Sequence, residues 1–497
     1  MTGALTTIVV PTVGRPSLFV LLDALTAGTR PLDTSVIVVD DRPPAERERK
    51  PLTLPDGVRG LASGGRGPAA ARNVGWRAAA TPWVSFLDDD VVPDQTWYAR
   101  LVEDLEAAPP RATGSSGRVS VPVPSHRRLT DWERATQGLE TATWITADLS
   151  YRRSALAAVG GFDERFPRAY REDADLARRV QEVGGRIAQG SRTVQHPVRP
   201  ADDWVSVRQQ AGNADDALMA RIHGRGWRER ARAPRGRAPL HVLTTAVAGT
   251  AIGAAVGRQW GVAGAAGLVW AGLTADFAWR RIAPGPRDPA ELRRMTLTSV
   301  AIPFAATWHL ARGRWIHRGA APWRGLPDLV LFDRDGTLIH DVPYNGEPEL
   351  VRPVDGARAA LNRLRSTGVK VGLVTNQSGV ARGLLTAAQV QAVNDKVATV
   401  LGPFDTVQVC RHGPSDGCGC RKPAPGMVKQ ACSDLGVSPS RCVVIGDIGS
   451  DIEAAESAGA VGILVPNAAT RSAEVRAASR FYDDVRSAVD GLLAGQW

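Results

Sequence analysis

The stretch Leu329–Leu338, LVLFDRDGTL, decides the fold of the C-terminal part of the chain. Its first four residues are apolar, which predicts a short buried strand. Asp333 and Asp335 follow at the carboxyl end of that strand, where open α/β sheets bind their ligands. One carboxylate there can attack phosphorus while the other carries the leaving-group proton, so the stretch indicates phosphate-ester chemistry. Gly336 lets the backbone turn away close to a phosphate.

Two further apolar runs also end in polar residues. Val369–Thr375 runs into Asn376, and hydroxyl and amide donors at a strand end suit phosphate oxygens. Lys422 supplies a point positive charge. A third run leads to Asp447 and Asp451, and Mg²⁺ prefers a few carboxylates together with phosphate and water. The order of these features favours a phosphate site with Mg²⁺ over the alternative, a strand that simply ends in an acidic turn.

A compact group of metal-type ligands precedes Lys422. Cys410, His412, Cys418 and Cys420 have the spacing C-x-H-x5-C-x-C. Three thiolates and one imidazole suit a closed tetrahedral Zn²⁺ site, which orders a loop rather than activating water. The alternative is a set of reduced cysteines beside a surface histidine.

The motifs DRDGT, TNQSGVARG, CRKP and GDIGSD stand in an order that resembles the haloacid dehalogenase-type phosphatases. With the cysteine–histidine spacing, they resemble the subfamily of D,D-heptose 1,7-bisphosphate and histidinol-phosphate phosphatases, over about Leu329 to Leu493. The resemblance implies that Asp333 is the nucleophile and Asp335 the general acid and base. It also implies a Mg²⁺ site of Asp333, Asp335 and Asp447, phosphate contacts from Thr375, Asn376 and Lys422, and substrate contacts from Arg382 and Arg421.

The composition bounds the class of protein. At 497 residues and 43% apolar, the chain is long enough for two or three domains with their own cores. Met1–Val10 lacks the basic segment of a signal peptide, and the five cysteines imply no disulfide framework, so we expect a cytoplasmic location. The net charge of +10 predicts anionic partners. Nucleic acid is not expected among them, because no basic module with interleaved aromatic residues is recognisable.

The N-terminal part alternates strands and helices. Leu5–Val10 and Ser35–Val39 are predicted strands, and Asp40 follows the second, where an acidic group can accept a hydrogen bond from a ribose or base. A glycine-rich segment then opens the helical stretch Ala69–Ala80, and its Arg72 is placed to receive a phosphate.

The predicted strand Trp83–Leu87 ends in three aspartates, Asp88 to Asp90. Together with GPAAARNVG at residues 67–75, this order resembles the family 2 glycosyltransferases with a GT-A fold, over about residues 4–220. The resemblance implies that a divalent cation held by these aspartates neutralises the diphosphate leaving group of a sugar nucleotide. The resemblance implies that Asp88 and Asp90 flank Mg²⁺ or Mn²⁺ and that Asp40 contacts the nucleotide. The alternative is an acidic loop in solvent.

Two later segments extend this resemblance. WITADLSYRRSAL at residues 144–156 looks like the acceptor side of these enzymes, which implies that Asp148 lies near the acceptor pocket. REDADLARR at residues 171–179 carries the acidic pair of the inverting members, which implies that Asp173 deprotonates the acceptor hydroxyl, with Glu172 as the other choice. The alternative for Asp173 is a favourable residue in the first turn of a helix.

The middle of the chain is apolar and rich in alanine and glycine. The runs His241–Gly257 and Gly261–Ala278 approach the length that crosses hydrocarbon, and Met295–Leu310 is interrupted by a proline and a histidine. Tryptophans near the ends of these runs and flanking arginines are typical of a membrane interface. We therefore predict membrane association through residues 241–311, as a two-span hairpin with the third run in the interface. The alternative is a soluble helical linker that packs on the transferase.

The sequence as a whole predicts an α/β protein of three parts: a GT-A glycosyltransferase at 1–225, a helical, membrane-associated linker at 226–325, and a Rossmann-like phosphatase with a zinc loop at 326–497. The predicted enzyme transfers a sugar from a nucleotide-sugar to an envelope glycan or lipid and hydrolyses a sugar phosphate, best a heptose 1,7-bisphosphate, at the inner face of the cell membrane. The alternatives are a histidinol-phosphate phosphatase in the C-terminal part, and a membrane scaffold whose transferase is degenerate.

Overall fold

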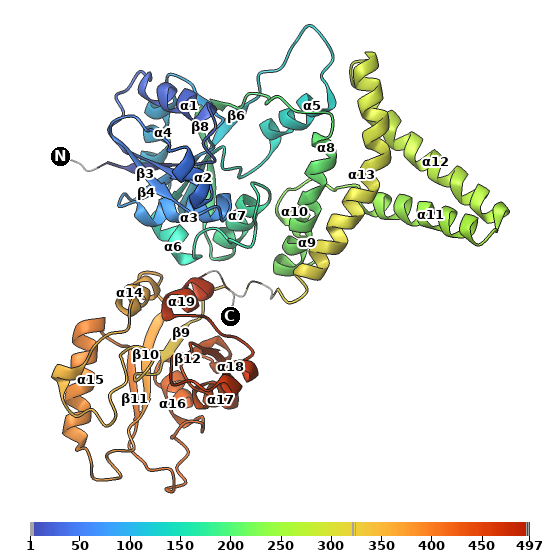
Figure 1. Ribbon diagram of the computed structural model, residues 1–497. Coiled ribbons are helices and arrows are strands. Elements are labelled where there is room, and N and C mark those ends of the chain that lie inside the picture. The colour runs from blue at the N-terminus through green and yellow to red at the C-terminus, as the bar shows by residue number, and fades with distance from the viewer. Residues whose placement is uncertain (1–3, 321–322, 324, 494, 496) are drawn as a thin grey trace. The chain divides into compact units, whose positions relative to one another are not determined.

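The computed structural model describes residues 4–320, 323, 325–493, 495 and 497. The chain divides into two compact units, one of Met1–Ala155 with Phe162–Pro322 and one of Leu156–Gly161 with Trp323–Trp497. Each unit contains one sheet (Figure 1). The predicted boundary between residues 225 and 226 lies inside the first unit, so the division into three parts stays a prediction.

The sheet of the first unit has eight strands in the order β3-β2-β1-β4-β7-β6-β8-β5. The first four strands of the chain run parallel, with β1 between β2 and β4, which is the arrangement expected from the alternation of apolar strands and helices. In the other half, β7 lies antiparallel to β4 and β6, and β5 antiparallel to β8. The strands are β1 (Thr6–Thr12), β2 (Ser35–Asp40), β3 (Val58–Ala62), β4 (Trp83–Leu87), β5 (Val92–Pro93), β6 (Ala112–Ser120), β7 (Asp148–Arg152) and β8 (Arg186–Gln195).

Helices cover this sheet by burying apolar side chains at helical spacing. In α1, for example, Leu18, Leu21, Leu22 and Leu25 are all buried in the core shared with β1 and β2. The helices of this part are α1 (Ser17–Thr26), α2 (Pro44–Arg49), α3 (Pro68–Ala78), α4 (Trp97–Glu106), α5 (Asp131–Gln137), α6 (Arg153–Ala158), α7 (Glu172–Glu182), α8 (Val205–Arg208), α9 (Gly212–His223) and α10 (Trp227–Arg230).

Three long helices complete the first unit: α11 (Ala238–Val256), α12 (Trp260–Ile282) and α13 (Pro289–Ile316). Figure 1 shows α11 and α12 as a hairpin that extends from α13. The two hairpin helices have the length and composition of membrane spans, and only 17% and 6% of their apolar windows are buried. Helix α13 instead packs along α9, where Gly313 lies so close that a Cβ there would approach the Ala214 backbone to 2.5 Å.

The sheet of the second unit has five parallel strands in the order β11-β10-β9-β12-β13. The stretch that begins the sequence argument forms the central strand, β9, and its four residues are fully buried. The strands are β9 (Leu329–Phe332), β10 (Lys370–Asn376), β11 (Thr406–Cys410), β12 (Cys442–Gly446) and β13 (Val461–Leu464). The helices are α14 (Ala357–Ser366), α15 (Ala387–Leu401), α16 (Gly426–Asp434), α17 (Gly449–Ala458), α18 (Ser472–Ala477) and α19 (Val485–Leu493).

Candidate active sites

The carboxyl ends of β9, β10 and β12 bring the predicted phosphatase residues to one edge of the second sheet. These strands are neighbours, so Asp333, Thr375 and Asp447 leave the sheet on the same side. The buried ammonium of Lys422 lies among them, and its Nζ is 2.5 Å from Asp333 Oδ1 and 2.6 Å from Asp451 Oδ1. A cation here compensates two carboxylates that are themselves removed from water.

Three carboxylates form a cluster around this point. Asp333, Asp447 and Asp451 each place an oxygen within 4.8 Å of the others. Burial is the main cause that raises the pKa of Asp333 to about 8. The neighbouring carboxylates raise this pKa further, and Lys422 compensates only in part. Burial and Asp451 raise the pKa of Asp447 to about 6. Three crowded carboxylate oxygens are a donor set that fits a small divalent cation such as Mg²⁺.

Asp335 lies outside this cluster, which differs from the predicted metal set. Its carboxylate accepts hydrogen bonds from the neighbouring Arg334 and from Gln377 Nε2 at 2.9 Å, and it is half-buried. The guanidinium and the amide draw the side chain of Asp335 away from the Asp447 side, and Asp451 takes the third place in the cluster instead. An acid and base that stands beside the metal ligands without joining them suits the role predicted for Asp335 in proton transfer.

The predicted phosphate ligands divide into two groups. Thr375 is buried, and its hydroxyl accepts a hydrogen bond from Gln377 Nε2. The Asn376 side chain does not point at the carboxylates: its Oδ1 accepts from the Lys422 backbone N–H and its Nδ2 donates to the Lys422 carbonyl, both at 3.1 Å. Asn376 therefore positions Lys422, and its role as a phosphate ligand stays a prediction. Gln377 was not predicted, although it directly follows the Thr-Asn pair.

The two arginines predicted to touch substrate are on loops. Arg382 is exposed and donates to the Tyr344 hydroxyl at 2.7 Å, and its guanidinium also lies 5.9 Å from the centre of that ring. Arg421 is next to Lys422 and donates to the His412 carbonyl at 3.4 Å. Arg421 thus links the charged site to the cysteine–histidine loop.

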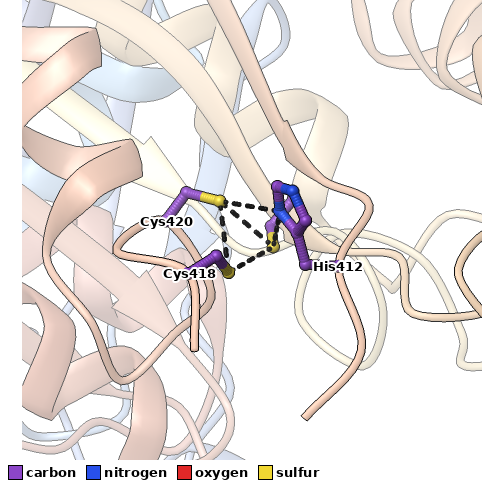
Figure 2. Close-up of side chains that lie close together, drawn as sticks. His412, Cys418 and Cys420 are labelled. Carbon is purple, nitrogen blue, oxygen red and sulfur yellow. Dashed lines mark hydrogen bonds between the residues drawn. The ribbon is translucent and has the colours of Figure 1, made fainter. Parts of the chain in front are cut away.

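Figure 2 shows His412, Cys418 and Cys420 converging on a common point. The His412 Nδ1 atom is 3.2 Å from Cys420 Sγ and 3.7 Å from Cys410 Sγ, and the three sulfurs lie 3.4–3.8 Å apart. Ligands about 2.3 Å from a tetrahedral Zn²⁺ are separated by about 3.8 Å, so the four atoms fit this ion. Cys432 and Cys442 are buried free thiols.

A buried cation also organises the site of the first unit. Arg72, on α3, is 1% exposed, and its Nη2 and Nη1 lie 2.6 Å from Asp88 Oδ1 and 2.9 Å from Glu172 Oε1. The Arg72 guanidinium thus pairs with two carboxylates, and its predicted role as a phosphate ligand stays a prediction. Burial and the adjacent Asp173 raise the pKa of Glu172 to about 8.

Asp173 begins α7 beside Glu172 and faces a cavity of about 840 Å³ that Asp88 also lines. Burial is the main cause that raises the pKa of the Asp173 carboxyl above its ordinary value. A carboxylate poised at a cavity wall with a raised pKa has the properties of a general base.

The three aspartates after β4 have different partners. Asp88 lines both the large cavity and an adjoining one of about 200 Å³. Asp89 accepts from Thr12 and Arg15, at 2.6 and 2.7 Å. Asp90 pairs with Arg199, and its Oδ1 is buried without a hydrogen-bond partner among the described residues. An orphaned buried carboxylate oxygen near Asp88 fits a bound divalent cation.

Two predicted ligands of the first unit pair with arginines. Asp40 is held by Arg42 through both carboxylate oxygens, at 2.9 and 2.6 Å, and its neighbour Asp41 lines the smaller cavity in its place. Asp148 is 1% exposed and accepts from Trp97 Nε1 and Arg192 Nε at 2.6 and 2.8 Å. Each carboxylate is buried against an arginine, and the roles predicted for Asp40 and Asp148 in binding nucleotide and acceptor stay predictions.

The comparisons with known proteins agree with two catalytic domains. The glycosyl transferase family 2 model matches residues 7–162 and the HAD-hydrolase-like model matches residues 419–490. The D-glycero-beta-D-manno-heptose-1,7-bisphosphate 7-phosphatase of Bordetella bronchiseptica is 37% identical over 142 residues, 28% of this chain and 79% of that protein. The Pseudomonas aeruginosa enzyme of the same name is 32% identical over 173 residues, 33% of this chain and 97% of that protein.

Among solved structures, the D,D-heptose 1,7-bisphosphate phosphatase of B. bronchiseptica complexed with magnesium and phosphate is 32% identical, with a TM-score of 0.31, and covers 33% of this chain and 98% of that one. The folds and sites define an enzyme with a family 2 glycosyltransferase domain at the N-terminus and a HAD-like phosphomonoesterase domain at the C-terminus. Through the latter domain, the chain belongs to the D-glycero-beta-D-manno-heptose-1,7-bisphosphate 7-phosphatase family.

Gly336 provides a sharp test of the phosphatase site. A Cβ at this position would lie 2.4 Å from Asp447 Oδ2 and displace that carboxylate. We expect Gly336→Ala to lower kcat/KM for phosphate release on the order of 100-fold, the cost of misplacing a reacting group by about 1 Å. Gly368→Ala is the matched control, because both glycines have a φ of +80° but Gly368 faces open space. Equal losses in both variants would show that backbone strain alone explains the effect.

Proposed function

We propose that the C-terminal domain hydrolyses D-glycero-D-manno-heptose 1,7-bisphosphate through an aspartyl-phosphate, and that the N-terminal domain transfers a sugar from a nucleotide-sugar to an envelope glycan or lipid. The observation that carries the first part is the position of Asp333, which lies against Lys422 and beside Asp447 and Asp451. The activity for which the related enzymes are named supports this choice of substrate.

In the hydrolysis, an Asp333 oxygen attacks the phosphorus and the bond to the sugar oxygen breaks. Asp335 gives its proton to that leaving oxygen and then takes one from the water that cleaves the aspartyl-phosphate. Lys422 stays charged throughout and balances the phosphoryl group. Mg²⁺, held by Asp333, Asp447 and Asp451, would neutralise the phosphate charge and keep Asp333 ionised, because a bound cation opposes protonation of its ligands. The magnesium in the related solved structure supports this assignment.

A panel of phosphate esters tests the substrate. We expect kcat/KM for heptose 1,7-bisphosphate to exceed that for histidinol phosphate by at least about tenfold, because unpaired polar groups penalise a poorly matched ester. Asp333→Asn should reduce phosphate release to background, whereas Asp395→Asn, an exposed aspartate of α15, should leave it unchanged. Faster turnover of histidinol phosphate would replace the heptose assignment, and activity in Asp333→Asn would remove the nucleophile.

We further propose that Cys410, His412, Cys418 and Cys420 hold one structural Zn²⁺. We expect the purified chain to contain about one equivalent of zinc by atomic emission. Cys420→Ser should lose it, because the site then has three good ligands, whereas Cys432→Ala, which removes a buried thiol outside the group, should retain it. Zinc-free wild-type protein with full phosphatase activity would contradict this proposal.

For the transferase, Asp173 is the proposed base and Asp88 with Asp90 the proposed site for Mg²⁺ or Mn²⁺. The acceptor hydroxyl gives its proton to Asp173, its oxygen attacks the anomeric carbon, and the bond to the nucleoside diphosphate breaks with the electron pair leaving on that diphosphate. The large cavity lined by Asp88 and Asp173 supports this arrangement, because it places the base and the cation site around one space.

The raised pKa of Asp173 predicts how the rate of sugar transfer depends on pH. A base acts only when deprotonated, so the transfer rate should fall as the pH drops through a value above the ordinary 3.8 of aspartate. Asp173→Asn should lower kcat by about 10²–10⁴-fold. Glu182→Gln, on the exposed end of the same helix, is the control. A pH profile and kcat that Asp173→Asn leaves intact would point to Glu172 or to a domain without catalytic function.

We propose that α11 and α12 insert into the inner face of the cell membrane as a hairpin while α13 stays at the interface. Helices of 19 and 23 residues extend about 28 and 34 Å, which matches a hydrocarbon core of about 30 Å. A hairpin returns the chain to its starting side, as two cytoplasmic active sites require. The chain should therefore remain with membranes after alkaline carbonate washing, and deletion of residues 238–282 should release it. Release of the intact chain by the same wash would contradict insertion.

A further inference from the structure

The first unit contains a second large cavity, of about 720 Å³, whose lining includes seven arginines. We call it the arginine cavity. It lies among the loop before α7, the segment before α11, and the inner sides of α11, α12 and α13. Seven arginines line it against two aspartates: Arg168, Arg171, Arg208, Arg228, Arg235, Arg237 and Arg281, with Asp131 and Asp216. This cavity is not part of the base and cation sites already described.

Two of the lining arginines have carboxylate partners of their own, Arg168 with Asp215 and Arg208 with Asp202, both at 2.8 Å. The carboxylates that contact Arg171, Arg228, Arg237 and Arg281 are shared between two arginines. Asp216 is shared by two lining arginines, with one oxygen 2.8 Å from Arg171 Nε and the other 2.6 Å from Arg228 Nη2. Asp131 is likewise shared, between Arg281 at 2.7 Å and Arg134 at 3.3 Å.

In the segment before α11, Arg237 also shares its carboxylate partner with another arginine. Asp276, the partner of Arg237 at 3.3 Å, is closer to Arg280, at 2.9 Å. Arg235, two residues before Arg237, has an exposed side chain. Because both arginines that share Asp216 line the cavity, this pairing leaves about one positive charge over there. Clustered arginines in a concave site are typical of phosphate recognition.

The position of the arginine cavity indicates what kind of molecule would carry an anion bound there. Ala169, Tyr170, Arg171, Gln209 and Pro234 line both this cavity and the one that holds Asp173, so the two adjoin. His241, Phe277 and Ile302 of the long helices also line the arginine cavity. The outer faces of these helices carry exposed Leu240, Leu243, Trp279 and Phe304. A ligand in the arginine cavity therefore lies near both a base and an apolar surface.

We propose that the arginine cavity binds the phosphate or diphosphate of a lipid-linked acceptor. This inference rests on the proposed transferase function and defines its acceptor. The hydrocarbon chain lies against the α11–α13 helices, the anion lies among the arginines, and the hydroxyl that receives the sugar reaches Asp173. Because the anion and the base occupy separate adjoining cavities, the acceptor is a lipid-linked sugar rather than a bare lipid phosphate, whose own oxygen would have to attack the anomeric carbon of the donor from among the arginines.

The test measures equilibrium binding of radiolabelled farnesyl diphosphate to the full chain in detergent, without any nucleotide-sugar. We expect the wild type to bind it more tightly than farnesol or inorganic pyrophosphate. The variant Arg235→Gln/Arg237→Gln should bind at least about tenfold more weakly, the value of one lost charge-assisted hydrogen bond. Arg225→Gln is the matched control, because it removes an exposed arginine of the same basic stretch that does not line the cavity.

Several results would overturn the inference. Equal affinity for farnesol means that no anion is recognised, and equal affinity for pyrophosphate means that the apolar chain contributes nothing. Equal competition by phosphatidylglycerol vesicles means that the arginines bind bulk headgroups. Equal binding by the double variant and the control places the anion elsewhere, and Arg235→Lys/Arg237→Lys, which should recover part of the affinity, separates charge from misfolding. The binding assay contains no nucleotide-sugar. Failure of sugar transfer in a separate assay would therefore count against the proposed transferase function and not against the binding of the lipid diphosphate.

Discussion

In each half of the chain one buried cation joins two carboxylates at the edge of a sheet. Lys422 lies between Asp333 and Asp451 in the phosphatase domain, and Arg72 lies between Asp88 and Glu172 in the transferase domain. Removing one member of such a buried set costs roughly 3–5 kcal/mol, because the remaining charges stay in a medium of low dielectric constant. The two chemically different sites thus depend on the same electrostatic constraint.

In each site the buried cation compensates only part of the charge of the surrounding carboxylates. Lys422 faces Asp333, Asp447 and Asp451, and the pKa values of about 8 and 6 for the first two show how strongly burial opposes their charges. In the transferase domain, the second oxygen of Glu172 and one oxygen of Asp90 likewise have no hydrogen-bond partner among the described residues. Carboxylates in excess of their buried cation are the common feature on which we base the proposal that each site binds a divalent ion.

The sequence predicts the parts of this arrangement that lie within short motifs. The strands before Asp333 and Asp88 are continuous apolar runs, and the four zinc-type ligands lie within eleven residues, so local spacing is enough to find them. Contacts between distant segments are less accessible. Arg72 and Glu172 are 100 residues apart in sequence, and the pairing of Asp148 with Arg192 spans 44 residues. A motif therefore identifies an aspartate but does not tell whether an arginine from elsewhere has already taken it, as happens at Asp148.

The most direct test of the constraint is a Mn²⁺ titration of the full chain followed by electron paramagnetic resonance, since Mn²⁺ reports each bound ion separately from the free one. The account predicts two sites in the wild type, with Asp447→Asn removing one and Asp88→Asn removing the other. A wild type without bound Mn²⁺, or a single substitution that abolishes both sites, would contradict two independent carboxylate centres.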